Sequence, residues 1–494
     1  MGIIRTQSIK NSIFSYIGVL LGYINLILLF PNYFTTEQFG LIQLLIIIAE
    51  VYSLLSAGGL TTSVIRFFPF YKSVDKQHEG FLIYVFLITF SGFTIISILY
   101  LIFRPLIVSA YIQKSSMFID YYFILIPFAF LSLVFNIFEV LVRAVLRTSF
   151  SVFVREVVLR ILTTIGIFLY IYGIINFHEF IIYYISIFLV CALLILFQII
   201  LSREYSLNVS FKNLHFFKLV EITKYGFYTL ISGAAMQTGL RIPALLIGSM
   251  VGLSMVGIYN LYYHLASVIY IPLRAMSRIA VPIIATAWKE NNLNQIRDIY
   301  VRTSIIQLIF GLLIYVGVII NRNNLFHFVK NSDYNVNFVF FPIIGLGILI
   351  DVATGLNSDI ILNSPKYKYD SFFNVLLLII CISAGLVLIP VFGGIGAALG
   401  FVLAYLSFNF LKWLFLFRKY QMQPFSYKQI VIIICGAVIY LIGDNIPVID
   451  NILLDIFIRS TIVTVIYFFL MLLLKISPDF NERFKFYKNR LLHK

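Results

Sequence analysis

The sequence predicts an all-α, polytopic membrane protein with about 14 transmembrane helices. Hydrophobic residues make up 61% of its 494 residues and charged residues only 12%, and the mean hydropathy is +0.99, far above the range of soluble domains. Apolar runs of about 18 to 25 residues recur along the chain. Because a backbone in hydrocarbon must satisfy its polar groups within the segment, these runs are expected to be helices.

The predicted spans are the apolar runs between polar breaks. In chain order they are 12–34, 41–65, 81–103, 117–138, 156–176, 180–201, 226–248, 256–282, 304–320, 337–361, 372–390, 394–417, 429–446 and 454–475. The first run is too long for a signal-peptide core, so it is expected to remain as the first helix. Most of the 36 Lys and Arg residues fall in alternate segments that begin with the N-terminus. This distribution predicts that both termini are cytoplasmic.

The net charge of +15 is explained by this topology, because basic loops face anionic lipid headgroups. It requires no nucleic-acid partner. The isolated residues Cys191, Cys381 and Cys435 each fall inside a span and are expected to be small core residues. The basic, aromatic tail 476–494 is expected either to lie along the cytoplasmic membrane surface or to be a disordered tail.

An internal repeat is visible at a spacing of nearly half the chain. "FGLIQL" (39–44) matches "VGIYNL" (256–261), and "YGII" (172–175) matches "FGGI" (392–395). The repeating unit holds six spans, an even number, so the two copies are predicted to be parallel lobes around a central cavity. The expected domains are an N-terminal lobe (1–201), a cytoplasmic linker (202–225), a C-terminal lobe (226–417), an appended helix pair (429–475) and the tail (476–494).

Three stretches carry a family resemblance: "KNSIFSYIGVLLGYINLILLFPNYFTTEQFGLIQL" near the N-terminus, "GGLTTSVIRFFPFYK" (58–72) and "VFGGIGAALG" (391–400). They resemble the polysaccharide flippases of the multidrug/oligosaccharidyl-lipid/polysaccharide exporter superfamily, and the resemblance covers the full length. It implies a bacterial inner-membrane protein that moves undecaprenyl-diphosphate-linked oligosaccharides between leaflets by alternating access. The implied process is the synthesis of O-antigen, capsule or exopolysaccharide.

The resemblance also implies partners and a working state. The partners are the lipid-linked oligosaccharide, membrane lipids and a polysaccharide polymerase or chain-length regulator, and the expected functional unit is a monomer. No cofactor is expected, and the coupling ion, H⁺ or Na⁺, is left open. The alternative function is a cation-coupled exporter of small organic molecules with the same fold.

Enzyme motifs are absent from the sequence. No Lys follows a Gly, which excludes a Walker A loop, and no two acidic residues are separated by a single residue, as a paired-acid metal-diphosphate site would require. His178 and Glu179 lack the second His of a helical zinc site. We therefore expect a protein that is not an enzyme and holds no metal.

Polar residues inside spans are candidates for function. On span 256–282 they follow helical spacing from Asn260 to Arg278, and on span 41–65 the same spacing joins Glu50, Ser53, Ala57 and Thr61. The predicted substrate-cavity or diphosphate-binding residues are Arg241, Arg274, Arg278, Arg66, Gln237, Asn25 and Asn260. The predicted coupling or gating residues are Glu50, Asp351 and His264.

Arg241 poses the sharpest question, because a charge at mid-helix costs about 2.5 to 3.5 kcal/mol on insertion scales. It could bind the substrate diphosphate, form a bridge or gate with Glu50 or Asp351, or reach the lipid headgroups. Arg274 and Arg278 could instead serve topology, and His264 could be a packing residue. A further basic cluster near the ends of spans four and five is expected to be solvated or to capture a lipid diphosphate: Arg143, Arg147, Arg155 and Arg160, with Glu139 and Glu156.

Overall fold

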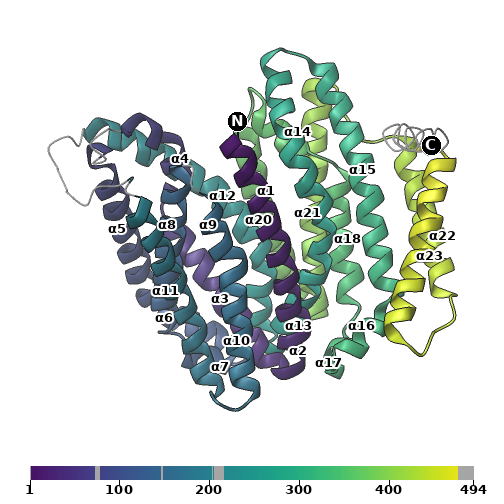
Figure 1. Cartoon of the computed structure of the whole chain (residues 1–494), viewed down its shortest axis with the longest axis horizontal. Coiled ribbons are helices and arrows are strands. Elements are labelled where there is room, and N and C mark those ends of the chain that lie inside the picture. The colour runs from purple at the N-terminus through teal and green to yellow at the C-terminus, as the bar shows by residue number, and fades with distance from the viewer. Residues whose placement is uncertain (1, 73–77, 146–147, 203, 205–215, 477–494) are drawn as a thin grey trace. The chain divides into compact units, whose positions relative to one another are not determined.

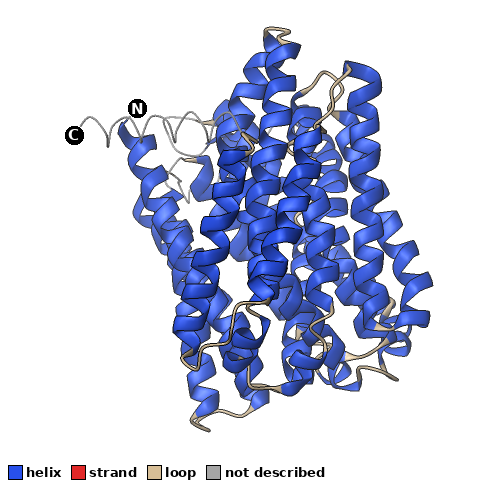
Figure 2. Ribbon diagram, turned by 90° about the vertical axis from the view of Figure 1, so that its right-hand side faces the viewer, coloured by secondary structure: helices blue, strands red, loops and turns tan. Residues whose placement is uncertain are grey.

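The computed structural model describes residues 2–72, 78–145, 148–202, 204 and 216–476. These residues form helices joined by short loops, and no strand occurs in the described ranges (Figure 2). The all-α prediction is confirmed. Half of the predicted linker 202–225 and all but the first residue of the predicted tail 476–494 lie outside the described residues.

The chain divides into two compact units, Met1–Asn260 and Leu261–Lys494, which we call unit 1 and unit 2. The boundary falls inside α13 (Leu253–Ala266), later than the predicted linker. The reason is that α12 (Phe216–Met250) packs on α3 (Thr36–Ser56) and α4 (Leu60–Tyr71), both in unit 1. The division into two six-helix lobes stays a prediction.

Unit 1 is built from long helices with shorter segments between them (Figure 1). Besides α3, α4, α12 and the first part of α13, it contains α1 (Gly2–Tyr23), η1 (Ile24–Leu29), α2 (Phe30–Tyr33), η2 (His78–Gly80), α5 (Phe81–Ile102), α6 (Arg104–Tyr111), α7 (Ser116–Asp120), α8 (Leu125–Ala144), α9 (Thr148–Phe153), η3 (Val154–Val158), α10 (Leu159–Ile171) and α11 (Phe177–Ser202).

The second predicted span is interrupted. It begins as α3, which starts at a capping box in which the side chains of Thr35 and Gln38 bond each other's backbone N–H groups. It stops at Gly58 and Gly59, whose φ angles of 58° and 78° lie in the left-handed region that favours glycine. The helix resumes as α4. The end of α3 and the start of α4 are joined across the break by a backbone bond from Leu60 N–H to Ala57 O.

Two glycines of the repeat motif meet inside unit 1. A Cβ atom on Gly40 would lie 1.8 Å from the backbone oxygen of Leu253, and one on Gly257 would lie 2.4 Å from the backbone oxygen of Thr36. The two helices α3 and α13 therefore approach backbone to backbone, as small residues allow in membrane proteins. Gly40 and Gly257 occupy equivalent positions in "FGLIQL" and "VGIYNL".

Unit 2 contains the remaining helices (Figure 1). They are η5 (Ser267–Tyr270), α14 (Ile271–Lys289), α15 (Leu293–Ile320), α16 (Arg322–Phe328), α17 (Ser332–Val336), α18 (Phe340–Ala353), α19 (Asn357–Asn363), α20 (Lys368–Phe392), α21 (Gly394–Tyr420), α22 (Tyr427–Asp444) and α23 (Ile452–Leu473). Helix α21 packs against both α18 and α20, and α15 packs between α18 and the α22–α23 pair.

The described residues contain 12 helices long and apolar enough to span a membrane, or 13 if α18 and α19, bent by 44°, form one span. These match 13 of the 14 predicted spans, so the chain is a multi-pass membrane protein. The remaining prediction, 156–176, corresponds to the continuous helical run from Thr148 to Ile171 through α9, η3 and α10. That run carries three charged residues, Arg155, Glu156 and Arg160.

The predicted stripe from Asn260 to Arg278 assumed an uninterrupted α-helix. The structure instead places the 3₁₀ segment η5 between α13 and α14. A 3₁₀ helix has three residues per turn, so the faces of α13 and α14 do not continue each other with the spacing of an α-helix. Pro272, near the start of α14, accounts for the change because it has no N–H to continue the α-helical bonds.

Candidate functional site

Unit 1 contains a polar cavity of about 430 Å³, within the size range of small-molecule sites. Five elements contribute to it: α3, α4, α8, η3 and α12. Its lining residues are Glu50, Ser53, Leu54, Ala57, Thr61, Asn136, Glu139, Val140, Arg143, Arg155, Gln237 and Arg241. We refer to it as the arginine cavity.

On one side of the arginine cavity, Arg241 is paired with Glu50. Arg241 Nη2 lies 2.9 Å from Glu50 Oε2, and the side chains are 28% and 51% exposed. Arg241, which the sequence places in an apolar run, therefore has a carboxylate partner on another helix. Glu50, one of the two partners considered from the sequence, is in contact with Arg241. Both side chains retain exposed surface, so the pair can open toward a ligand.

On the other side, Glu139 holds two arginines. Its carboxylate accepts bonds from Arg143 Nη2, one turn further along α8, and from Arg155 Nε on η3. Arg155 also donates to Asn136 Oδ1 at 2.6 Å and lies over the ring of Phe135 at 4.8 Å. Glu139 is only 2% exposed, whereas both arginines are more than one third exposed. The buried carboxylate thus positions two guanidinium groups at the wall of the cavity.

The arginine cavity has a cationic excess, since three arginines face two glutamates. Guanidinium groups form paired, charge-assisted hydrogen bonds with carboxylates and phosphates alike. The guanidinium donors are already held close together by the carboxylates of Glu50 and Glu139, which are oxyanions as phosphates are. A diphosphate in the cavity would therefore meet preorganised donors. Ser53, Thr61, Asn136 and Gln237 add neutral polar atoms that suit sugar hydroxyls.

The structure brings together part of the predicted site. Gln237, Arg241 and Glu50 line the cavity, and the predicted stripe of span 41–65 lies there in full. Sequence reasoning missed Asn136. It also favoured a solvated position for Glu139, which the structure corrects by burying it. Arg147 of that basic cluster lies outside the described residues.

Asn25 lies elsewhere. Its Nδ2 donates to the backbone oxygen of Arg160 at 3.0 Å, and its Oδ1 accepts from Thr164 at 2.8 Å. Arg160 in turn bonds the backbone oxygen of Gly18 and, at 2.9 Å, Glu156 Oε2. This group joins α1 to α10 next to the π-helical segments η1 and η3. A substrate role for Asn25 stays a prediction.

Two further candidates of unit 1 also lie apart from the arginine cavity. Arg66 is exposed on α4, with its guanidinium 4.3 Å from the ring centroid of Tyr225. Asn260 is buried, and its Nδ2 donates to the backbone oxygen of Val256 at 2.9 Å. The predicted substrate roles of Arg66 and Asn260 are not supported by a place in this cavity and stay predictions.

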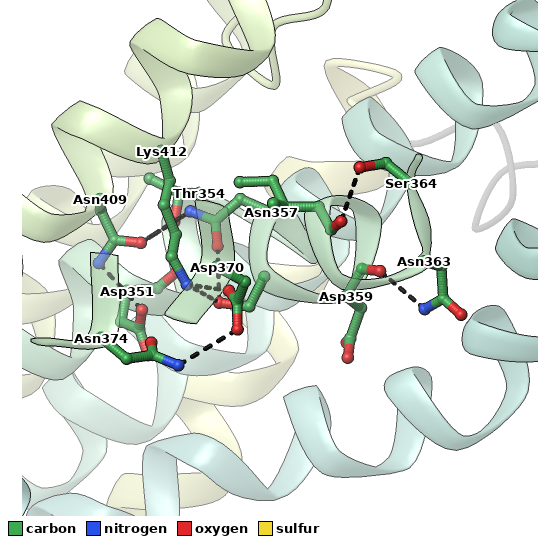
Figure 3. A network of polar contacts seen from close by, with 12 residues as sticks. Asp351, Thr354, Asn357, Asp359, Asn363, Ser364, Asp370, Asn374, Asn409 and Lys412 are labelled. Carbon is green, nitrogen blue, oxygen red and sulfur yellow. Dashed lines mark hydrogen bonds and ion pairs between the residues drawn. The ribbon is translucent and has the colours of Figure 1, made fainter. Parts of the chain in front are cut away.

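In unit 2, Asp351 belongs to a buried polar network (Figure 3). Its carboxylate accepts from Asn409 Nδ2 at 2.9 Å and from the Tyr270 hydroxyl at 3.1 Å. Asn409 Oδ1 accepts from Thr354 and from Asn357, each at 2.8 Å. The network joins α18 and α19 to α21. A coupling or gating role for Asp351 remains a prediction.

The other unit 2 candidates are on α13 and α14. His264 is half-buried, and its backbone oxygen accepts from Ser267 Oγ at 2.7 Å. Arg274 and Arg278 are exposed on α14. Among the described residues, no group of three or more His, Cys, Asp or Glu is placed to hold a metal ion.

A family model described as "Polysaccharide biosynthesis protein" matches residues 6–288, more than half of the chain. The chain belongs to this family. The matched region contains every lining residue of the arginine cavity. A comparison with curated proteins gives no match.

Solved structures show the same fold. The lipid II flippase MurJ in an inward closed conformation matches with a TM-score of 0.74 at 16% identity, over 95% of this chain and 98% of that one. An inward-facing multidrug resistance MATE transporter of the MOP superfamily matches with a TM-score of 0.62 at 11% identity, over 81% and 93%. A MATE structure in complex with MaL6 matches with 0.53 at 12%, over 83% and 94%. This protein therefore has a fold that flippases and exporters share.

Proposed function

We propose that this protein is a flippase that moves oligosaccharides linked to undecaprenyl diphosphate from the cytoplasmic to the outer leaflet of the bacterial inner membrane. It would work by alternating access, with both termini in the cytoplasm, without a covalent step of its own and ahead of a polysaccharide polymerase. The family match and the fold support a transporter of this kind. The observation that carries the choice of substrate is the arginine cavity.

The physical problem of such a substrate is its diphosphate, because an isolated anion is very costly to move into a medium of low dielectric constant. Three arginines meet this need, since the guanidinium group is a permanent cation that forms paired bonds with phosphate oxygens. Within the cavity, Glu50 and Glu139 balance two of the three charges. When a diphosphate replaces these partners, each arginine exchanges a carboxylate for a phosphate, so its charge stays paired.

The alternative is an exporter of organic cations, a function suggested by the fold shared with MATE transporters. A cation-binding cavity should hold an excess of carboxylates and exposed aromatic faces. The arginine cavity has the opposite charge balance and contains no aromatic residue among its lining residues. Its composition favours the flippase.

The test uses purified full-length protein in proteoliposomes. The substrates are a fluorescent polyprenyl-diphosphate oligosaccharide, the matching monophosphate, and a cationic dye. We expect transport of the diphosphate, weaker transport of the monophosphate and none of the dye; dye transport without diphosphate transport would overturn the proposal. Imposed H⁺ and Na⁺ gradients in the same vesicles identify the coupling ion.

A cellular experiment tests the biological role. Cells that lack the protein should accumulate lipid-linked oligosaccharide facing the cytoplasm and should lose surface polysaccharide. Unchanged surface polysaccharide together with reduced dye efflux would contradict the flippase function.

A further inference from the structure

Lys412 is a charged residue buried inside unit 2. It lies on α21, eight residues before the end of that helix, and none of its side chain is exposed. Its Nζ lies 2.7 Å from Ser358 Oγ on α19 and 2.7 Å from Asp370 Oδ1 on α20. It also lies 4.0 Å from the ring centroid of Phe408. Two oxygen partners and one aromatic face thus surround an ammonium that has three hydrogens to donate.

The carboxylate of Asp370 is fully engaged. Its second oxygen accepts from Asn374 Nδ2 at 3.2 Å (Figure 3). A buried carboxylate that loses its counter-charge is strongly destabilising, because the charge has been removed from water without compensation. Asp370 therefore depends on a cation at the position that the Lys412 ammonium holds.

Lys412 is bonded to a residue next to a break in a membrane-spanning helix. Helices α18 and α19 meet at an angle of 44°, across Gly355, whose φ of 67° is in the left-handed region. Helix α21 contacts both sides of the break within one turn: Asn409 bonds Thr354 and Asn357, and Lys412 bonds Ser358. The angle of the broken span is therefore held by polar groups of α21.

We propose that the ammonium of Lys412 is a built-in cation, which fills the place of a bound monovalent cation in unit 2 and fixes the break between α18 and α19. An ammonium on a flexible stem is a compact point charge, comparable in its partners to a small monovalent cation held by oxygen atoms. Because the cation is covalently attached, unit 2 needs none from solution to keep its shape. This inference does not depend on the transported substrate.

Other ionisable groups near this position are part of the same charge balance. Asp351 and Asp359 lie on α18 and α19, and Tyr270 and Tyr405 stand beside Asp351. Asp351 is bonded by Asn409 and Tyr270, and Asp359 by Ser277. Of these three carboxylates, Lys412 bonds that of Asp370. Removing Lys412 should therefore leave a site for a small cation centred on Asp370.

The experiment measures the apparent Tm of purified full-length protein in choline chloride, NaCl, KCl, LiCl and methylammonium chloride at equal ionic strength. Three proteins are compared: wild type, K412M and K412M/D370N. The single variant exposes Asp370 without a partner, and the double variant removes both charges while keeping similar volume. Wild type should show the same Tm in all salts. K412M should melt several degrees lower in choline and recover in at least one small cation, and K412M/D370N should not respond.

Two results of the melting experiment would overturn the proposal. One is a K412M variant whose Tm is the same in every salt; the other is a wild-type protein that small cations stabilise as much as they stabilise K412M. If K412M does not accumulate in cells, the proposal requires that K412M/D370N does, since the cause is the unpaired charge. Failure of both variants would show that the packing of Lys412, and not its charge, matters.

Discussion

The Arg241–Glu50 pair allows substrate contact and structural bridging to be separated by two substitutions of matched size, R241Q and E50Q. Each replaces a charged end with an amide and leaves a group that can still form hydrogen bonds. If the pair is a bridge, both variants break the same interaction and should behave alike. If Arg241 binds the diphosphate, only R241Q should impair binding.

The expected magnitudes differ enough to be measured. A partly exposed ion pair such as this one, with side chains 28% and 51% exposed, contributes about 0.2–1 kcal/mol to folding. Both variants should therefore lower the free energy of unfolding by less than about 1 kcal/mol. A hydrogen bond to a charged group contributes about 1.5–3 kcal/mol, so losing the contact between Arg241 and phosphate should weaken binding about 10- to 150-fold.

The assay compares the Kd for a short-chain polyprenyl diphosphate and the initial transport rate of the lipid-linked oligosaccharide. R241Q should weaken binding as stated, whereas E50Q should bind as tightly as wild type or more tightly, because the cavity gains positive charge. R302Q serves as the control, since it removes an exposed ion pair with Asp298 on α15. Equal loss of transport in R241Q and E50Q, with no further loss in the double variant, would refute the reasoning in favour of a bridge or gate.

Three further predictions concern the scaffold. R459M should lower the free energy of unfolding by about 3–5 kcal/mol, because it leaves the buried carboxylate of Asp455 unpaired; a smaller shift in Tm for D455N/R459M than for R459M checks the cause. G40A should cost about 1–3 kcal/mol or more, because its Cβ would lie 1.8 Å from a backbone oxygen; G233A, which meets nothing within 4 Å, is the control, and equal yields and Tm values would contradict the prediction. N25A should lower the Tm through the lost bonds to α10 while the Kd for the diphosphate stays unchanged, and a weakened Kd would instead place Asn25 at the substrate.

The sequence was sufficient to predict the elements that depend on one segment alone. The apolar runs gave 13 of the spans as single or bent helices because hydrocarbon imposes helix formation within each segment. Helical spacing also placed Glu50 and Ser53 on one face of α3, and that face lines the arginine cavity, as does Thr61 on α4 beyond the helix break. Local periodicity is enough for the placement of Glu50 and Ser53, since both lie on α3.

Contacts between distant segments could not be predicted from local periodicity. The sequence shows that Arg241 needs compensation, but the identity of its partner depends on how α12 packs against α3. Lys412 could have been noticed, since it lies inside the predicted span 394–417, yet nothing local indicates that Asp370 and Ser358 would enclose it. For η5 a local signal existed in Pro272, but whether a proline kinks or changes a helix depends on its surroundings.

The contact between Gly40 and Gly257 constrains both segments of the repeat motif. A side chain at Gly40 would meet the backbone oxygen of Leu253, and one at Gly257 would meet that of Thr36, so neither position can gain a side chain while the opposite backbone stays in place. The short match between "FGLIQL" and "VGIYNL" therefore has a steric basis: glycine at both positions lets the backbones of α3 and α13 approach each other, whatever substrate the protein carries.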